Sequence, residues 1–122
     1  MKIEINNLRK IFSIQDEFTR AFPNLKIEFY EYADKGGTRY KHLIKTGSKT
    51  LGECRTQSKD GVIEIKSGMT IGELKNIFKE TYGLNVDMFQ RSVYSNLDGS
   101  WVSDATILEP VVIKEDNSPP VE

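Results

Sequence analysis

The spacing of apolar residues changes twice within the first thirty residues of the chain. Residues 1–5 alternate and are rich in β-branched side chains, which predicts a short strand. Apolar side chains then recur at the spacing of one helix face, at Ile11, Ile14, Phe18 and Phe22. Pro23 ends this helix, and strict alternation over residues 25–30 predicts a half-buried strand.

The same order of patterns returns in the second half of the chain. Residues 62–66 read as a strand, and Thr70 with Glu73 matches a capping box at the start of a helix. The predicted buried stripe of this helix consists of Ile71, Leu74, Ile77, Phe78 and Tyr82. Gly83 suits the left-handed residue that ends a helix, and residues 84–93 predict a longer strand.

These two β-α-β units align with each other at an offset of sixty residues. Identical residues occupy six aligned positions, namely Ile3 and Ile63, Glu4 and Glu64, Ile5 and Ile65, Ile11 and Ile71, Phe18 and Phe78, and Phe29 and Phe89. Conservative matches add Ile14 with Leu74 and Phe22 with Tyr82. Each unit leaves one apolar face uncovered, so the two units should bury these faces against each other.

Tandem β-α-β units predict an α+β fold. We expect a two-layer sandwich, in which a four-stranded antiparallel sheet carries two helices on one face, as in the ferredoxin-like arrangement. Asp98-Gly99 suits a tight turn into an extra C-terminal hairpin strand near Trp101. The alternative is a β-grasp-like second half over residues 61–114.

The chain length fits one domain, which we expect to span residues 1–114, with pseudo-repeats at 1–33 and 61–93. Between them lies a polar, basic linking segment, 34–60, in which Gly36-Gly37 reads as a turn. We expect 34–48 to be the most mobile internal part and 49–56 to form a short helix. The tail, 115–122, contains Pro119-Pro120 and is expected to be disordered.

Thirteen apolar residues are predicted to form the common core of the two units. They are Ile3, Ile5, Ile14, Phe18, Phe22, Ile27, Phe29, Ile63, Ile65, Leu74, Phe78, Val86 and Met88. At 122 residues the chain is long enough to bury such a core without disulfides or metals.

Composition places the chain among ordinary water-soluble domains. Charged residues make up 29% and hydrophobic residues 38%, and the formal net charge is −1. No apolar run reaches the ~20 residues that would span a bilayer. The first residues lack the apolar stretch of a secretory signal, and the single cysteine, Cys54, excludes an internal disulfide. We therefore expect a cytoplasmic protein without a membrane partner.

Charge is unevenly distributed along the chain. Residues 35–59 carry seven basic residues against Glu53 alone, whereas the chain from Asp87 onward has an excess of five negative charges. The two regions either neutralise each other or leave a basic surface for an anionic partner. The candidate binding surface consists of Tyr30, Tyr32, Lys35, Arg39, Lys41, Lys45 and Lys49.

Several short motifs also resemble a known group of sequences. They are FTRAFPNLKIEFY from Phe18, KTLGECR from Lys49, MTIGELK from Met69 and YGLNV from Tyr82, followed by Trp101. Together they resemble a family of small uncharacterised bacterial proteins over residues 10–108. Because that family has no assigned activity, the resemblance implies a shared fold and no catalytic residue.

No set of residues in the sequence predicts catalysis or cofactor binding. His42 and Cys54 are the only residues of their kinds, too few for a zinc site, and nothing holds them together as a nucleophile–base pair. Residues 47–50 lack the spacing of a phosphate-binding loop. We expect no catalytic residue, metal or cofactor.

The leading hypothesis for function is a non-enzymatic cytoplasmic binding or interaction module whose partner is another protein. The alternative is a nucleic-acid-binding module that uses the basic 35–59 segment and an open sheet face, on which aromatic side chains would stack bases. A small enzyme that works through Cys54 or a carboxylate is the third alternative.

Overall fold

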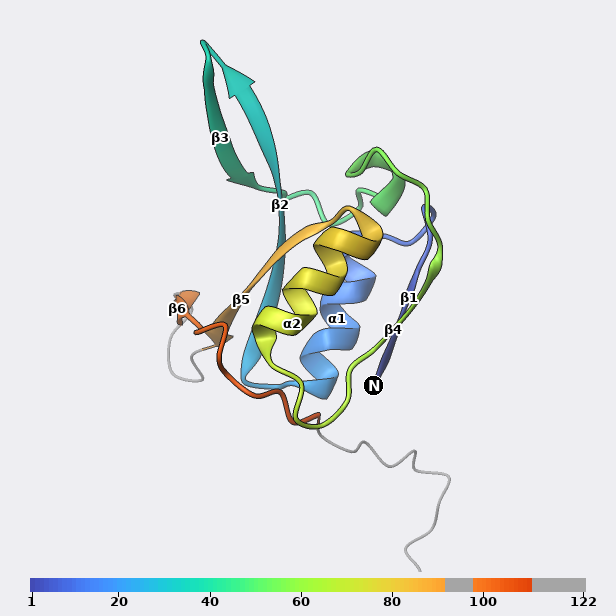
Figure 1. Ribbon diagram of the computed structural model, residues 1–122, viewed down its shortest axis with the longest axis vertical. Helices are drawn as coiled ribbons and strands as arrows, with labels where there is room; N and C mark the ends of the chain where they lie inside the picture. The colour runs from blue at the N-terminus through green and yellow to red at the C-terminus, as the bar shows by residue number, and fades with distance from the viewer. Residues whose placement is uncertain (92–97, 111–122) are drawn as a thin grey trace, which may run out of the picture.

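The computed structural model describes residues 1–91 and 98–110, and it confirms the α+β class (Figure 1). The chain forms, in order, β1 (Lys2–Ile5), α1 (Ile11–Ala21), β2 (Leu25–Lys35), β3 (Thr38–Leu43), the 3-10 turn η1 (Leu51–Glu53), β4 (Gly61–Glu64), α2 (Ile71–Asn76), the π-helical turn η2 (Ile77–Thr81), β5 (Asn85–Arg91) and β6 (Asp98–Trp101). The tail predicted to be disordered, 115–122, lies outside the described residues.

The strands are divided between two antiparallel sheets. One sheet contains β1 and β4, and the other has the order β3-β2-β5-β6. The sequence led us to expect one four-stranded sheet, but β2 pairs directly with β5, from Leu25 opposite Gln90 to Tyr30 opposite Asn85. Alternation reveals which face of a strand is buried and not which strand lies beside it, so this pairing was invisible in the sequence.

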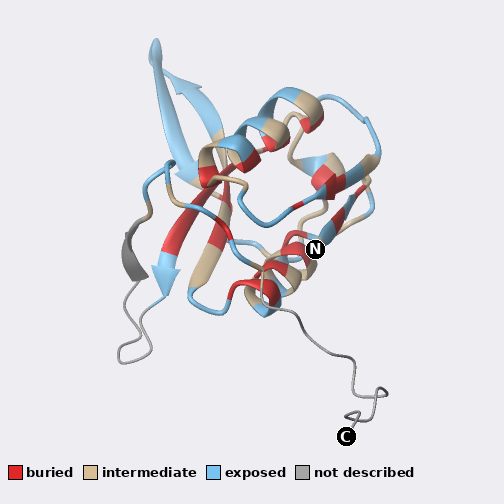
Figure 2. Cartoon of the chain, turned by 60° about the horizontal axis from the view of Figure 1, so that its bottom comes forward, coloured by how far each residue is buried: buried red, intermediate tan, exposed pale blue. Residues whose placement is uncertain are grey.

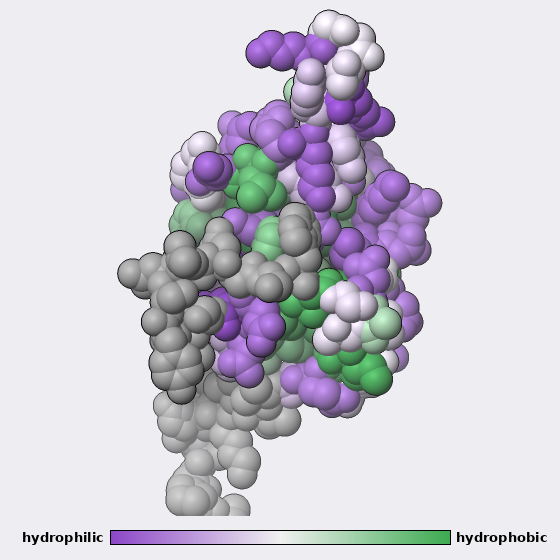
Figure 3. Space-filling model, turned by 90° about the vertical axis from the view of Figure 1, so that its left-hand side faces the viewer, coloured by the Kyte–Doolittle hydropathy of each residue, from purple (hydrophilic) through white to green (hydrophobic). Residues whose placement is uncertain are grey.

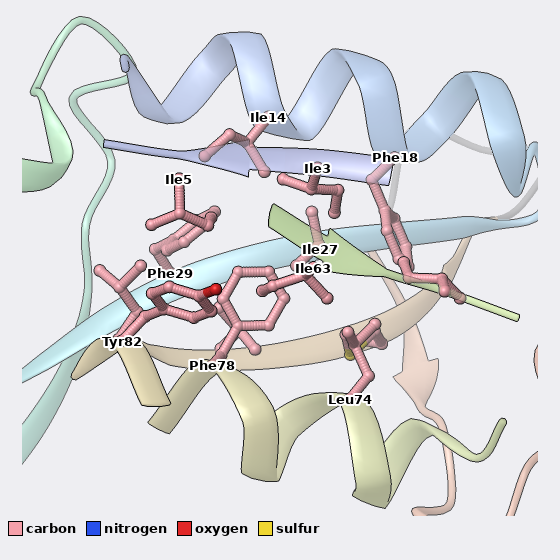
Figure 4. Close-up of a cluster of buried hydrophobic side chains, with 14 of the residues drawn as sticks. Ile3, Ile5, Ile14, Phe18, Ile27, Phe29, Ile63, Leu74, Phe78 and Tyr82 are labelled. Atoms are coloured by element: carbon pink, nitrogen blue, oxygen red, sulfur yellow. The ribbon is translucent and has the colours of Figure 1, made fainter. Parts of the chain in front are cut away.

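The core lies between the two sheets and the two helices (Figure 4). Ile3 and Ile63 point into it from one sheet and Ile27 and Phe29 from the other. Phe78 of η2 meets Phe29 edge to face, with ring centroids 6.0 Å apart. All thirteen predicted core residues are buried. Figure 2 shows how buried and exposed residues are distributed over the chain. Four elements that each expose one apolar face thus cover one another.

The two halves of the molecule are related by a local twofold pseudosymmetry. Ile3 lies directly opposite Ile63 in the small sheet, and Glu28 lies opposite Asp87 in the large one. An antiparallel pairing of two equivalent segments is symmetric about the point where equivalent residues meet. In the small sheet the two residues at the symmetry point, Ile3 and Ile63, are sixty positions apart in the sequence. In the large sheet the corresponding residues, Glu28 and Asp87, are fifty-nine positions apart.

The start of each helix is covered by a segment from its own half of the chain. The amide of Ile11 donates to the Lys49 carbonyl, and the amide of Ile71 donates to the Thr106 carbonyl, each at 2.9 Å. The segment that covers the start of α2 also forms an isolated bridge between Thr70 and Ile107. At the start of each helix, a backbone amide that could otherwise bind an anion therefore donates to a backbone carbonyl instead.

The linking segment contains strands that the sequence did not predict, while its expected mobility stays a prediction. Most of residues 34–48, expected to be the most mobile internal region, belongs to the β2–β3 hairpin. The predicted short helix at 49–56 is a single 3-10 turn at Leu51–Glu53, begun by the Thr50 amide donating to Glu53 Oε2 at 2.8 Å. Beyond it, the fully buried Arg55 side chain donates to Asn7 Oδ1 at 2.8 Å and to the Tyr82 carbonyl at 3.1 Å. Arg55 thus connects the two halves.

Candidate functional site

The β2–β3 hairpin extends beyond the rest of the molecule (Figure 1). We call residues 30–43 the arm; every residue from 32 to 42 is exposed (Figure 2). Its two strands pair from Tyr30 opposite Leu43 to Lys35 opposite Thr38. Gly36 and Gly37 form the two-residue turn with φ of 59° and 82°, values that favour glycine and match the twist of a hairpin.

Four of the predicted binding residues meet on one face of the arm. Tyr30 and Tyr32 lie edge to face, with ring centroids 5.6 Å apart. The Arg39 guanidinium lies 4.3 Å from the centre of the Tyr32 ring, and Lys41 Nζ lies 4.0 Å from that of Tyr30. Each cation therefore stacks on an aromatic ring of the neighbouring strand, which restricts its conformations before any partner binds.

The base of this face is held by a buried carboxylate. Asp87 is only 4% exposed, and its two oxygens lie 2.6 Å from Lys41 Nζ and 2.9 Å from Lys75 Nζ. Burial alone would lower the pKa of Lys75, but hydrogen bonds to Asp87 and Asp104 raise it. Lys75 therefore stays charged and fixes Asp87, which in turn positions Lys41 against the sheet.

The surroundings of Tyr30 favour the protonated form of its phenol. Burial, a side-chain hydrogen bond with Tyr32 and the nearby Asp87 carboxylate together raise the pKa of Tyr30. A raised pKa keeps the phenol protonated at neutral pH, where it serves as a donor.

The remaining predicted residues lie elsewhere. Lys35 is next to the turn, opposite Thr38, and Lys45 is exposed beyond the end of β3. Lys49 Nζ lies 3.7 Å from Glu31 Oε1, an oxygen that also lies 3.1 Å from His42 Nε2. Lys49 and His42 thus share Glu31 on the second face of the arm.

Sequence reasoning missed the two residues that anchor the arm, Lys75 and Asp87. Asp87 interrupts an otherwise apolar run from Val86 to Phe89, and a charge in such a run is a signal for a buried ion pair. The arm itself was missed because its strands alternate without a buried face, so only the two glycines marked it.

The residues considered for catalysis have ordinary structural partners. Cys54 Sγ donates to the Thr50 carbonyl at 3.2 Å, and burial raises the pKa of the thiol, which disfavours the reactive thiolate. His42 pairs with Glu31, as described above. Within residues 1–91 and 98–110, no three His, Cys, Asp or Glu side chains are grouped to hold a metal ion.

Comparisons with known proteins add no identification. No protein-family model, curated protein or solved structure matches the chain. The resemblance to a family of small bacterial proteins therefore stays a prediction. In the part of the chain that the structure covers, the helices are too short or too polar to span a bilayer.

Proposed function

We propose that this chain is a non-enzymatic binding module and that the arm is the surface that contacts its partner, another protein. The observation that carries this proposal is that a hairpin with paired strands projects from the body with residues 32–42 exposed. Figure 3 shows it as a column of mainly hydrophilic and intermediate residues above the body. Since the arm adds nothing to the core, its stacked tyrosines and cations are better explained by contact with a partner.

Nucleic acid remains the alternative partner, because the same residues, Arg39 and Lys41 with Tyr30 and Tyr32, could meet phosphates and bases. Three observations favour a protein. Lys41 is paired with Asp87 and Lys49 with Glu31, and the arm carries a second carboxylate at Asp34. These carboxylates reduce the positive potential that nucleic-acid binding requires.

A shortened arm tests the proposal. Residues 32–41 are replaced by Asn-Gly, so that Glu31 and His42, which already face each other, flank a two-residue turn. The fold should persist because no core residue is removed and Asp87 keeps Lys75. Tagged wild type and variant are then compared for the proteins that they retain from lysates of the source cell, identified by mass spectrometry.

We expect the shortened arm to lose proteins that both the wild type and a Lys79→Glu control retain, since Lys79 is exposed on η2, outside the arm. Nuclease treatment of the lysate should leave this result unchanged. An identical set of retained proteins with and without the arm would refute the proposal.

Two finer expectations accompany the proposal. Residence in the cytoplasm is supported by the free thiol of Cys54, the single cysteine. A ferredoxin-like relationship is supported by the two β-α-β units and by the antiparallel pairing of β1 with β4. Its strict strand order would place β2 and β5 at opposite edges, whereas here they are neighbours, so the relationship stays a prediction.

A further inference from the structure

β3 is the outer strand of the four-stranded sheet, and no described strand pairs with its outer edge. The direction of its backbone groups follows from one hydrogen bond, in which the Ile44 amide donates to the Phe29 carbonyl at 2.8 Å. In an antiparallel ladder alternate residues face the partner strand, so the even-numbered residues of β3 face β2. The backbone N–H and C=O groups of Arg39 and Leu43 consequently face away from β2, on the outer edge of the sheet.

The positive charge of this edge favours an acidic strand as its binding partner. Residues 38–45 contain Arg39, Lys41 and Lys45 and no acidic residue. If a second copy paired there with Tyr40 opposite Tyr40, Arg39 would face Lys41, and like charges directly opposite each other destabilise a sheet. An acidic strand would instead place carboxylates beside these cations.

The two faces of β3 call for different side chains in that strand. Arg39 and Lys41 are on the face with Tyr30 and Tyr32, and stacking leaves the N–H groups in the plane of the Arg39 guanidinium able to donate to a carboxylate. Tyr40 is on the other face, 51% exposed and opposite Ala33. An added strand would therefore meet cations on one face and an aromatic ring on the other.

We propose that the outer edge of β3 binds an extended peptide segment of a partner protein in which acidic side chains alternate with apolar ones. The segment adds a strand to the sheet; its acidic residues lie beside Arg39 and Lys41, and its apolar residues lie beside Tyr40. Main-chain hydrogen bonds supply affinity and the alternation supplies specificity. This inference rests on the proposed function and names the partner's chemistry.

The probe is a fluorescein-labelled peptide of alternating Glu and Val, titrated with the intact chain at low salt and followed by fluorescence anisotropy. A Lys-Val peptide of equal length is the charge control. Two further Glu-Val peptides carry N-methyl groups, one on the Glu nitrogens and the other on the Val nitrogens. Strand addition uses only one edge of the peptide, so one methylated peptide should bind about tenfold or more weakly while the other keeps its affinity.

On the protein side, Arg39→Glu should weaken Glu-Val binding about tenfold, whereas Lys79→Glu, the same charge change outside the arm, should not. Equal effects of the two methylation patterns, or equal binding of the Lys-Val peptide, would overturn the inference. Binding of heparin or single-stranded DNA in place of the Glu-Val peptide would overturn it in favour of a nucleic-acid partner.

The two proposals fail in different ways. If the variant with the shortened arm loses cellular partners but the wild type does not bind the Glu-Val peptide, the arm is the contact surface and the proposed acidic–apolar peptide is the wrong ligand. If the shortened arm retains every partner, the proposed function itself is wrong.

Discussion

At the scale of single residues, two carboxylates meet at the centre of the large sheet. Glu28 and Asp87 lie directly opposite each other on β2 and β5, an arrangement that repulsion would destabilise. Each has a partner in its own half of the molecule, since Gln15 Nε2 donates to Glu28 at 2.8 Å and Lys75 Nζ lies 2.9 Å from Asp87. Asp87 has a second partner from the first half, Lys41, at 2.6 Å. Gln15 and Lys75 are equivalent in the sixty-residue repeat.

Replacing Lys75 with Met should destabilise the protein by about 2 kcal/mol, less than the 3–5 kcal/mol typical of a broken buried pair, because Lys41 still contacts Asp87. Urea unfolding measures the change, with Lys79→Met as the exposed control. The folded-state pKa of Lys75 is raised, so its contribution is fully present below the unfolded-state pKa of about 10.4 and is lost as pH rises through the folded-state value. A difference between wild type and variant that vanishes at neutral pH would contradict this role.

At the scale of elements, the sequence predicted what depends on burial. The repeat aligns Ile11 with Ile71, the residue after Thr70, and α1 does begin at Ile11. The capping box of Thr70 and Glu73 forms as expected, with the Glu73 amide donating to Thr70 Oγ1 at 3.1 Å. The strands of the arm bury neither face, so apolar periodicity could not reveal them; nor could it reveal the Lys41–Asp87 contact across 46 residues.

Amide hydrogen exchange should show the arm as an edge hairpin and not as a loop. Amides of Tyr40 and His42, which face β2, should exchange more slowly than those of Arg39 and Leu43, which face outward. NMR exchange rates in the free protein give the comparison residue by residue. Uniformly fast exchange across residues 38–43 would mean that the hairpin does not persist in solution.

At the scale of the whole molecule, two equivalent halves share one core and both sheets. The fully buried Arg55 side chain follows the arm in the chain and contacts Asn7 of the first half and Tyr82 of the second. The linking segment therefore contributes to the packing of the two halves, because its Arg55 side chain bonds to both.

Arg55→Met should destabilise the whole molecule by about 2–3 kcal/mol, because Met roughly fills the space but leaves the Asn7 and Tyr82 oxygens without their donor. Arg20→Met is the matched control: Arg20 is 70% exposed and pairs with Asp16 one helical turn away, a contact worth about 0.5 kcal/mol or less. Both are measured by urea unfolding. Similar losses for the two variants would show that Arg55 does not hold the halves together.

The pairing of equivalent strands also determines when this chain can fold during its synthesis. β1 pairs with β4, and β2 pairs with β5 as well as with β3, so one pairing in each sheet joins residues about sixty positions apart. At a translation rate of about 5–20 residues per second, each strand of the first half leaves the ribosome some 3–12 s before the second-half strand that pairs with it. Through that interval its isoleucine and phenylalanine faces stay exposed to the cell, which makes the nascent first half a natural client for chaperones.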